Sequence, residues 1–282
     1  MNRKPQLISA GIILALLAVI VIGIALAVFL AVFFTRNSSS SEDDYPDSMN
    51  NYRSYKNSIK QLRIAMISDD DKETFDNKTF WSHMYIGTID TTEEKWKYTQ
   101  TEAIDFSTGF NILASKSRGN ELSDLVWFYD TLYSFDDKTG IGFEMDTVNK
   151  NMYPRMIFAG SNGTSKIGMK VEWSTVMGDQ MVIGSHGNTH WDGREDYQNS
   201  YVHYIDKDLS QETVAWIDEY ENINRALNIT YPGYVTNEAI SYSNQNDQWY
   251  VFPRKVSEEE YNETRDYTLS SEYFLICDNN VN

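Results

Sequence analysis

The stretch LVWFYDTLYSFDDKTGIGFEM, residues 125–145, decides the fold class of this chain. Leu125–Phe128 and Thr131–Phe135 are short and rich in aromatic and β-branched residues, as strands are. Ile141–Met145 alternates large apolar residues with small or charged ones, which is the period of a half-buried strand. Between the last two segments, Asp136–Gly140 has the acidic and glycine residues of a turn. The sequence therefore predicts an antiparallel hairpin with a glycine-closed loop.

Segments of the same kind recur from about Gln61 onward. We expect further strands at Leu62–Ile67, Met169–Thr175, Gln180–Gly184, Tyr201–Ile205, Ala239–Tyr242, Trp249–Pro253 and Tyr273–Cys277. Only Gln211–Leu227 has a helical pattern, and Tyr231-Pro232-Gly233 ends that segment. Many short strands with Gly- and Asp-rich turns indicate an all-β domain built as a sandwich, barrel or propeller.

The N-terminal part is not globular. Leu7–Thr35 carries no charge and would form roughly 40 Å of helix at about 1.5 Å per residue, enough to cross a bilayer with some tilt. The run is longer than the apolar core of a signal peptide, so it predicts an uncleaved signal-anchor; a cleaved signal peptide, and hence secretion, is the alternative. Arg3 and Lys4 place the N-terminus in the cytosol and the rest in the lumen or outside. The predicted organisation is a cytosolic N-terminus, a transmembrane signal-anchor, a flexible polar stalk and one folded domain, at residues 1–6, 7–35, 36–58 and 59–282.

Charge and cysteine content limit the partners of this domain. The net charge of −17 argues against nucleic acid and against an anionic membrane surface. The acidity suits either a cation site or simple solubility. Cys277 is the only cysteine, so no internal disulfide can form. In a lumenal domain the Asn-X-Ser/Thr sequons become candidate glycosylation sites; they lie at Asn37, Asn77, Asn162, Asn228 and Asn262.

The stretch Gly168–Ser174, GMKVEWS, has a strict alternation. In a strand, Met169, Val171 and Trp173 share one face and Lys170 and Glu172 share the other. From the residues alone, the second face is a solvated strand face.

Seven segments, in order from about residue 60 to the end of the chain, resemble those of the calcium-activated nucleotidase (apyrase) family. They are Ile64–Thr74, Phe80-Trp81-Ser82, Gly119–Leu125, Leu132–Gly140, Gly168–Trp173, Tyr231–Tyr242 and Trp249–Lys255. The resemblance implies a five-bladed β-propeller that hydrolyses nucleoside diphosphates, and in some members triphosphates, to the monophosphate and phosphate.

The resemblance also implies a calcium ion in the central tunnel, with ligands drawn from successive blades. The positions that match are Ser123 in ELSDL, Glu172 in KVEWS and Glu238 in TNEAIS. Calcium takes about six to eight hard oxygen ligands, which hydroxyl and carboxylate groups supply. Without the resemblance, Ser123 is a turn or cap serine and both glutamates are solvated.

Phosphate chemistry needs cations for the phosphate oxygens and an oriented water. Arg254 and Lys170 are the cationic candidates for binding the substrate. Asp69, Asp71 and Asp137 are the candidates for orienting or deprotonating the attacking water. Taken alone, these acids belong to a solvated turn and a hairpin turn.

Other site classes are not expected. His83, His186, His190 and His203 do not predict zinc, because the segment holding His186 and His190 is Gly-rich and not helical, and no HExxH occurs. The chain has no GxGxxG, P-loop, GxSxG or CxxC, which excludes Rossmann and P-loop nucleotide recognition.

Three departures from the family pattern bear on function. Gly160–Gly163 stands where the family has Asp-Gly-Asp-Gly, and Gly187–His190 stands where it has Gly-Lys-Glu-Trp. Family members also continue well past Cys277, through two more calcium ligands. We therefore expect an incomplete propeller of about three to four blades.

Two functions follow from the resemblance. The first is a calcium-dependent nucleoside diphosphatase, a single-pass type II membrane protein of the ER, Golgi or cell surface, which also forms a homodimer. The second is a propeller remnant that binds without catalysis.

Overall fold

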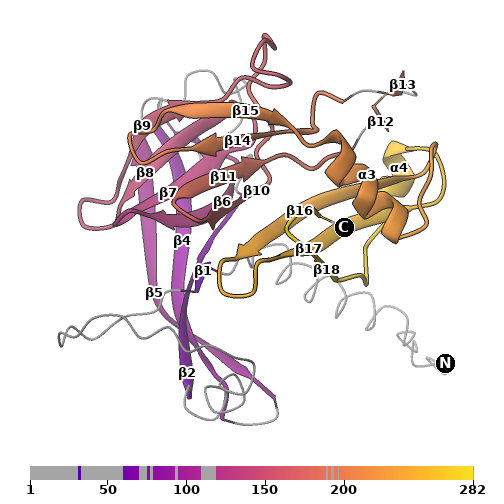
Figure 1. The fold of residues 1–282 in the computed structure, drawn as a ribbon. Helices are drawn as coiled ribbons and strands as arrows, with labels where there is room; N and C mark the ends of the chain where they lie inside the picture. The colour runs from indigo at the N-terminus through magenta and orange to yellow at the C-terminus, as the bar shows by residue number, and fades with distance from the viewer. Residues whose placement is uncertain are drawn as a thin grey trace, which may run out of the picture.

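The fold of the described residues is almost entirely β (Figure 1). The computed structural model describes residues 60–69, 79–92, 95–108, 119–188 and 197–281, with the backbone of the short pieces 31–32, 75–76, 190–191 and 194–195. The all-β prediction is confirmed.

The strands form consecutive antiparallel units. The first unit comprises β2 (Gln61–Ile67), β4 (Thr79–Asp90) and β5 (Lys97–Thr108), with β3 (Phe75–Asp76) paired to β4. The second is a four-stranded meander of β6 (Leu122–Phe128), β7 (Thr131–Asp136), β8 (Ile141–Asp146) and β9 (Asn151–Ile157). One parallel residue pair, Ser107 with Asn151, joins β5 to β9 and makes a single sheet of both units.

The third unit has β10 (Trp173–Met177), β11 (Gln180–Gly184), β14 (Tyr201–Ile205) and β15 (Gln211–Ala215). A small ribbon of β12 (His190–Trp191) and β13 (Arg194–Glu195) lies between β11 and β14 in the chain. After helix α3 (Ile217–Ala226), the last unit comprises β16 (Tyr234–Ser243), β17 (Gln248–Ser257) and β18 (Leu275–Cys277), with helix α4 (Glu263–Asp266) between β17 and β18.

The first strands of successive units lie side by side. β2 contacts β6, β6 contacts β10, and β10 contacts β16. Side-chain hydrogen bonds link β10 to the β16–β17 hairpin: the Tyr242 backbone N–H donates to Thr175 Oγ1 at 2.9 Å, and Asn244 Nδ2 donates to the Val176 carbonyl at 3.0 Å. Propeller blades place their first strands around a common axis in this way. The number of blades and the closure of a ring stay predictions.

The predicted hairpin at residues 125–145 is confirmed. β7 and β8 pair antiparallel, and Gly140 closes the turn with φ +69°, a conformation that favours glycine. The strands expected at Gln180–Gly184 and Tyr201–Ile205 have the observed bounds. The sequence did not predict β4, β5 or β9.

Two expectations at the third unit are wrong in part. Gln211–Leu227 is not one helix, because Gln211–Ala215 pairs with β14 as strand β15 and the helix begins only at Ile217. Met169–Thr175 is a strand only from Trp173 onward. The residues before Trp173 cross between the second and third units, held by Met169 N–H to Phe158 O at 2.8 Å and by Glu172 N–H to Gly184 O at 2.9 Å.

The predicted anchor and stalk lie outside the described residues, except for Ala31–Val32. These two residues form strand β1, which pairs with β2, so they are extended where the sequence predicted a helix. No helix in the described part of the chain is both long and apolar enough to cross a membrane. The anchor stays a prediction.

The largest aromatic cluster surrounds Trp173. Its fully buried ring lies 5.3 Å from the Trp216 ring and 6.2 Å from the Trp249 ring, centroid to centroid. Trp173 Nε1 donates to the Ser185 carbonyl at 2.8 Å and to Tyr220 Oη at 3.1 Å. The indole N–H is therefore satisfied inside the core, and one side chain joins β10, α3 and β17.

Gly184 lies opposite Trp173 in the β10–β11 register, where only a hydrogen fits. A Cβ at this position would lie 2.0 Å from the Trp173 ring. We expect Gly184→Ala to lower the free energy of unfolding by about 1–3 kcal/mol, because the ring has no room to move. Urea denaturation measures this.

Gly160→Ala is the matched control. Its added methyl group would meet neighbours at 3.4–3.5 Å, which is ordinary van der Waals contact. A loss of stability no larger for Gly184→Ala than for Gly160→Ala would contradict the proposed packing of Trp173.

Candidate functional site

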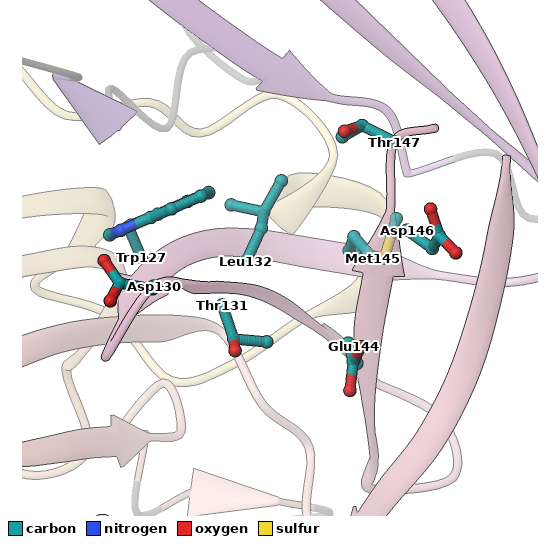
Figure 2. Close-up of a pocket in the computed structure, with 8 residues that line it drawn as sticks. All are labelled: Trp127, Asp130, Thr131, Leu132, Glu144, Met145, Asp146 and Thr147. Atoms are coloured by element: carbon teal, nitrogen blue, oxygen red, sulfur yellow. The ribbon is translucent and has the colours of Figure 1, made fainter. Parts of the chain in front are cut away.

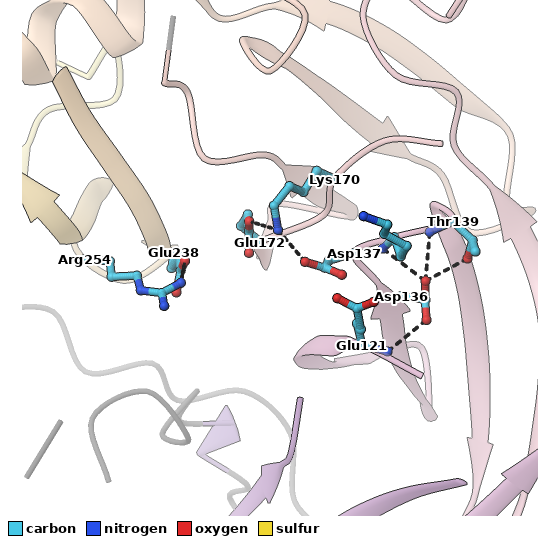
Figure 3. A network of polar contacts seen from close by, with 9 residues as sticks. Glu121, Asp136, Asp137, Thr139, Lys170, Glu172, Glu238 and Arg254 are labelled. Atoms are coloured by element: carbon cyan, nitrogen blue, oxygen red, sulfur yellow. Dashed lines mark hydrogen bonds and ion pairs between the residues drawn. The ribbon is translucent and has the colours of Figure 1, made fainter. Parts of the chain in front are cut away.

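Five charged side chains gather where the second, third and fourth units meet (Figure 3). We call them the charged cluster: Asp137, Lys170, Glu172, Glu238 and Arg254. Asp137 follows β7, Lys170 and Glu172 precede β10, Glu238 lies in β16, and Arg254 lies in β17.

The alternation in Gly168–Ser174 positions two members. Met169 and Val171 are buried in the core, so Lys170 and Glu172 are directed to the opposite side. That side is not simply solvated, which corrects the reading of the residues alone. The Glu172 side chain is 7% exposed, whereas that of Lys170 is 46% exposed.

Lys170 bridges two carboxylates. Its Nζ pairs with Glu172 Oε1 at 2.6 Å and with Asp137 Oδ2 (Figure 3). Burial opposes the charge of Lys170, but Glu172 and Asp137 outweigh it and raise the pKa of the ammonium above its ordinary value. Burial also raises the pKa of the Glu172 carboxyl; Lys170 opposes this rise, and the charges of Glu238 and Asp137 add to it. The Lys170 ammonium therefore offsets the repulsion between the Glu172 and Asp137 carboxylates and the cost of burying them in the folded protein.

Asp136 and Asp137 are adjacent but have different roles. Asp136 is fully buried, and its Oδ1 accepts from Thr139 N–H and Thr139 Oγ1, both at 2.8 Å. Its Oδ2 accepts from Glu121 N–H at 2.9 Å. Asp136 therefore holds the turn, which leaves Asp137 to face Lys170. Asp137 Oδ1 is buried and has no hydrogen-bond partner in the described part of the chain.

A β-bulge presents the Arg254–Glu238 ion pair. The β16–β17 register shifts on both sides of Asn237, next to Glu238. Bulges redirect side chains in this way. Burial opposes the charge of Arg254, but the adjacent Glu238 outweighs it and raises the pKa of the guanidinium. The two side chains are 40% and 16% exposed, so the pair is open to solvent on the arginine side.

The other predicted site residues are placed as follows. Asp69 forms a backbone bridge with Glu121, whose carbonyl accepts from Asp137 N–H at 2.8 Å. The acid after β2 is thus brought to the same end of the sheet as Asp137. Asp71 lies outside the described residues. Ser123 is buried in β6 and makes no hydrogen bond to the charged cluster among the residues the structure describes.

The three predicted metal ligands lie on neighbouring strands. Ser123 is in β6, Glu172 directly precedes β10 and Glu238 is in β16, and these strands contact one another in that order. The second, third and fourth units therefore each contribute one oxygen-bearing side chain along this row.

A family model named Apyrase matches residues 68–282 of this sequence. The chain belongs to the apyrase family. It is 32% identical to the apyrase of Cimex lectularius over 77% of the chain and 28% identical to the apyrase of Phlebotomus duboscqi over 91%. It is also 28% identical to soluble calcium-activated nucleotidase 1 of Mus musculus over 76% of the chain. The chain spans 61%, 72% and 54% of these relatives.

The WD40 domain of Pan2 from Neurospora crassa aligns with 69% of the chain and 59% of its own length. The TM-score is 0.31 and the identity 10%, a likeness too weak to decide the fold.

Sequence reasoning missed Asp124, which ties two units of this apyrase-family domain together. Asp124 Oδ2 accepts from Ser174 N–H at 2.5 Å and from Ser174 Oγ at 2.7 Å. Burial raises the pKa of Asp124 to about 7, and the Ser174 hydrogen bonds oppose that rise. Asp124 follows Ser123 and Ser174 follows Trp173, so this contact fixes β6 against β10. The acidic residue in ELSDL was the available signal, but only the fold shows its partner.

The histidines do not form a zinc site among the described residues. His83 Nδ1 lies 2.8 Å from Asp105, and His203 and His186 are each buried in separate surroundings. The His190 side chain lies outside the described residues. In the part of the chain that the structure describes, no three His, Cys, Asp or Glu side chains form a group that could hold a metal ion.

A separate pocket lies at the other end of the second unit (Figure 2). Its lining residues come from the β6–β7 turn and the end of β8: Trp127, Asp130, Thr131, Leu132, Glu144, Met145, Asp146 and Thr147. Asp146 accepts hydrogen bonds from Val148 N–H and Asn149 N–H, so it stabilises its own turn. The pocket contains none of the predicted site residues.

Lys170→Met tests the balance of the charged cluster. It leaves Asp137 and Glu172 without their cation, and we expect a loss of about 2 kcal/mol of folding free energy. That is less than for a fully buried pair, because Lys170 is half exposed. Burial already raises the pKa of the Glu172 carboxyl to about 8, and without Lys170, which opposes that rise, it goes higher still. The unchanged protein releases this proton near pH 8, whereas the folded variant keeps it to higher pH, so the stability deficit of the variant grows as the pH rises from 6 to 9.

Urea denaturation at both pH values measures this deficit. Lys138→Met is the control, because Lys138 is exposed, and it changes stability by less than about 0.5 kcal/mol. An equal deficit for Lys170→Met at pH 6 and pH 9 would refute the charge balance.

Proposed function

We propose that this chain hydrolyses nucleoside diphosphates such as UDP and GDP to the monophosphate and phosphate, in a calcium-dependent reaction. The observation that carries the proposal is the charged cluster, in which Lys170 and Arg254 are held by three carboxylates where neighbouring strands meet. Membership of the apyrase family supports nucleotide phosphatase activity in general.

Lys170 and Arg254 are the groups that bind phosphate oxygens. Their side chains are 46% and 40% exposed, so N–H groups not used in the ion pairs can reach a ligand. Arg254 suits a bidentate contact with two phosphate oxygens, and Lys170 acts as a compact positive charge. The carboxylates hold the Lys170 and Arg254 side chains in place before the substrate binds.

The residues present fit calcium by their chemistry. Ser123, Glu172 and Glu238 offer only oxygen atoms, and the unpartnered Asp137 Oδ1 is a further buried oxygen nearby. Calcium, when bound, supplies Lewis acidity and a template for phosphate oxygens. Because Lys170 and Arg254 pair with these acids, the acids are shared between the basic side chains and the ion.

Asp137 is the best placed of the three acids proposed to act on water. Its Oδ2 faces Lys170, and its Oδ1 is a buried acceptor that has no hydrogen-bond partner in the described part of the chain. Asp69, at the same end of the sheet, and Asp71 are the other candidates.

We also propose that the domain is lumenal or extracellular, held by the uncharged segment 7–35, and forms a homodimer. In support of the location, the sequon residues Asn162, Asn228 and Asn262 are all exposed. Glycosidase sensitivity and gel filtration test the two statements.

The activity itself is tested by phosphate release. The full chain is expected to release phosphate from UDP or GDP with added calcium and to lose this activity with a chelator. Phosphate release that is unchanged in the presence of a chelator would contradict the proposed calcium dependence. Binding of nucleotide without any phosphate release would favour the alternative, a non-catalytic binding module.

Glu172→Gln tests the calcium ligand. We expect the calcium concentration for half-maximal activity to rise at least about tenfold, since even outer-shell changes at metal sites cost that much. The fold should survive, because burial already disfavours the charge of Glu172 and Lys170 keeps Asp137 as a partner. Glu212→Gln, on the exposed side of β15, is the matched control. Equal calcium dependence in the two variants removes Glu172 from the ligand set.

A further inference from the structure

His186 belongs to a loop that is hydrogen-bonded to the strand carrying Glu238, but it has no role in the proposal above. It follows β11 and is 6% exposed. Its carbonyl accepts from Asn237 N–H at 3.0 Å and from Asn237 Nδ2 at 3.2 Å. Asn237 precedes Glu238, so the His186 loop is fixed to the strand that carries one end of the cluster.

The hydrogen bonds of the ring determine which nitrogen carries the proton. Asn188 N–H donates to His186 Nδ1 at 3.0 Å. A ring nitrogen that accepts has no proton, so in the neutral ring the proton is on Nε2. Burial lowers the pKa of His186 to about 3, and the charges of Lys170 and Arg254 contribute; Asp266 opposes them. The ring is therefore neutral, with an Nε2–H donor, throughout the physiological range.

The Nε2–H group has no partner of its own. His186 Nε2 makes no hydrogen bond within the described residues, yet it is not among the polar atoms that are sealed from solvent. An N–H group that has no hydrogen-bond partner and is not fully buried can donate a hydrogen bond to a ligand. Since Lys170 and Arg254 both act on the ring electrostatically, that ligand would also lie near two positive charges.

We propose that His186 is a substrate-binding residue whose Nε2–H donates a hydrogen bond to a phosphate oxygen of the nucleotide held by Lys170 and Arg254. This rests on the proposed function and adds a residue to it. Lys170 and Arg254 are each drawn to neighbouring carboxylates, whereas a neutral imidazole is not. His186 is thus a donor that the acids of the site do not compete for, and it adds a contact to an anion without adding charge.

Two substitutions separate this role from a structural one. In His186→Asn the amide oxygen lies near the position of Nδ1. This variant keeps the acceptor for Asn188 N–H and loses the donor at the position of Nε2. In His186→Gln the longer side chain brings its amide NH₂ to the position of Nε2. This variant keeps the donor to the ligand and loses the acceptor for Asn188 N–H. For His186→Asn we expect KM for UDP to rise about tenfold with a melting temperature close to that of the unchanged protein. For His186→Gln we expect KM within about threefold and a lower melting temperature.

The reverse pattern, with KM unchanged in His186→Asn and raised in His186→Gln, overturns the proposal, as does an unchanged KM in both variants. Calorimetric titration with inorganic pyrophosphate separates the proposal from the proposed function. If the unchanged chain hydrolyses no nucleotide but binds pyrophosphate, and His186→Asn weakens that binding about tenfold, the function fails and the phosphate contact of His186 stands. If the chain shows neither hydrolysis nor pyrophosphate binding, both fail.

Discussion

The packing of the Trp173 ring is the constraint on which the arrangement of the site depends. Trp173 joins β10 to α3 and β17 through two other tryptophans and two hydrogen bonds. In the residues just before it, Met169 and Val171 are buried in a neighbouring apolar cluster, and Lys170 and Glu172 belong to the charged cluster. The Trp173 ring therefore anchors one end of the segment that carries two charged side chains of the site.

Burying these charged side chains requires oppositely charged partners. Asp137, Glu172 and Glu238 are largely buried acids, and an isolated buried carboxylate is costly. Lys170 and Arg254 offset much of that cost through direct ion pairs. The cluster has three carboxylates and two basic side chains, so its net negative charge favours a bound cation. The basic side chains favour a phosphate group. The proposed function assigns both tasks, holding calcium and binding phosphate, to members of this cluster.

The sequence predicted what depends on local pattern and on family motifs. The hairpin at residues 125–145 was readable because aromatic strands and a glycine turn follow one another. Glu172 was taken for a solvated residue without the resemblance, since alternation gives the face but not what covers it. The segment Gln211–Ala215 was assigned to a helix because pairing with β14 is not visible in its own residues. Asp124 and the position of His186 beside β16 were missed for the same reason: their partners, Ser174 and Asn237, are distant in the chain.

Side-chain hydrogen bonds link β10 to β6 and to the β16–β17 hairpin. Asp124 with Ser174, and Thr175 with Tyr242, are contacts that single substitutions can change while each unit keeps its own backbone pairing. The separations among Ser123, Glu172 and Glu238 are therefore adjustable independently of the strands that bear them. Substitutions at a few linking residues can therefore change the spacing of these three side chains without changing the pairing within any sheet.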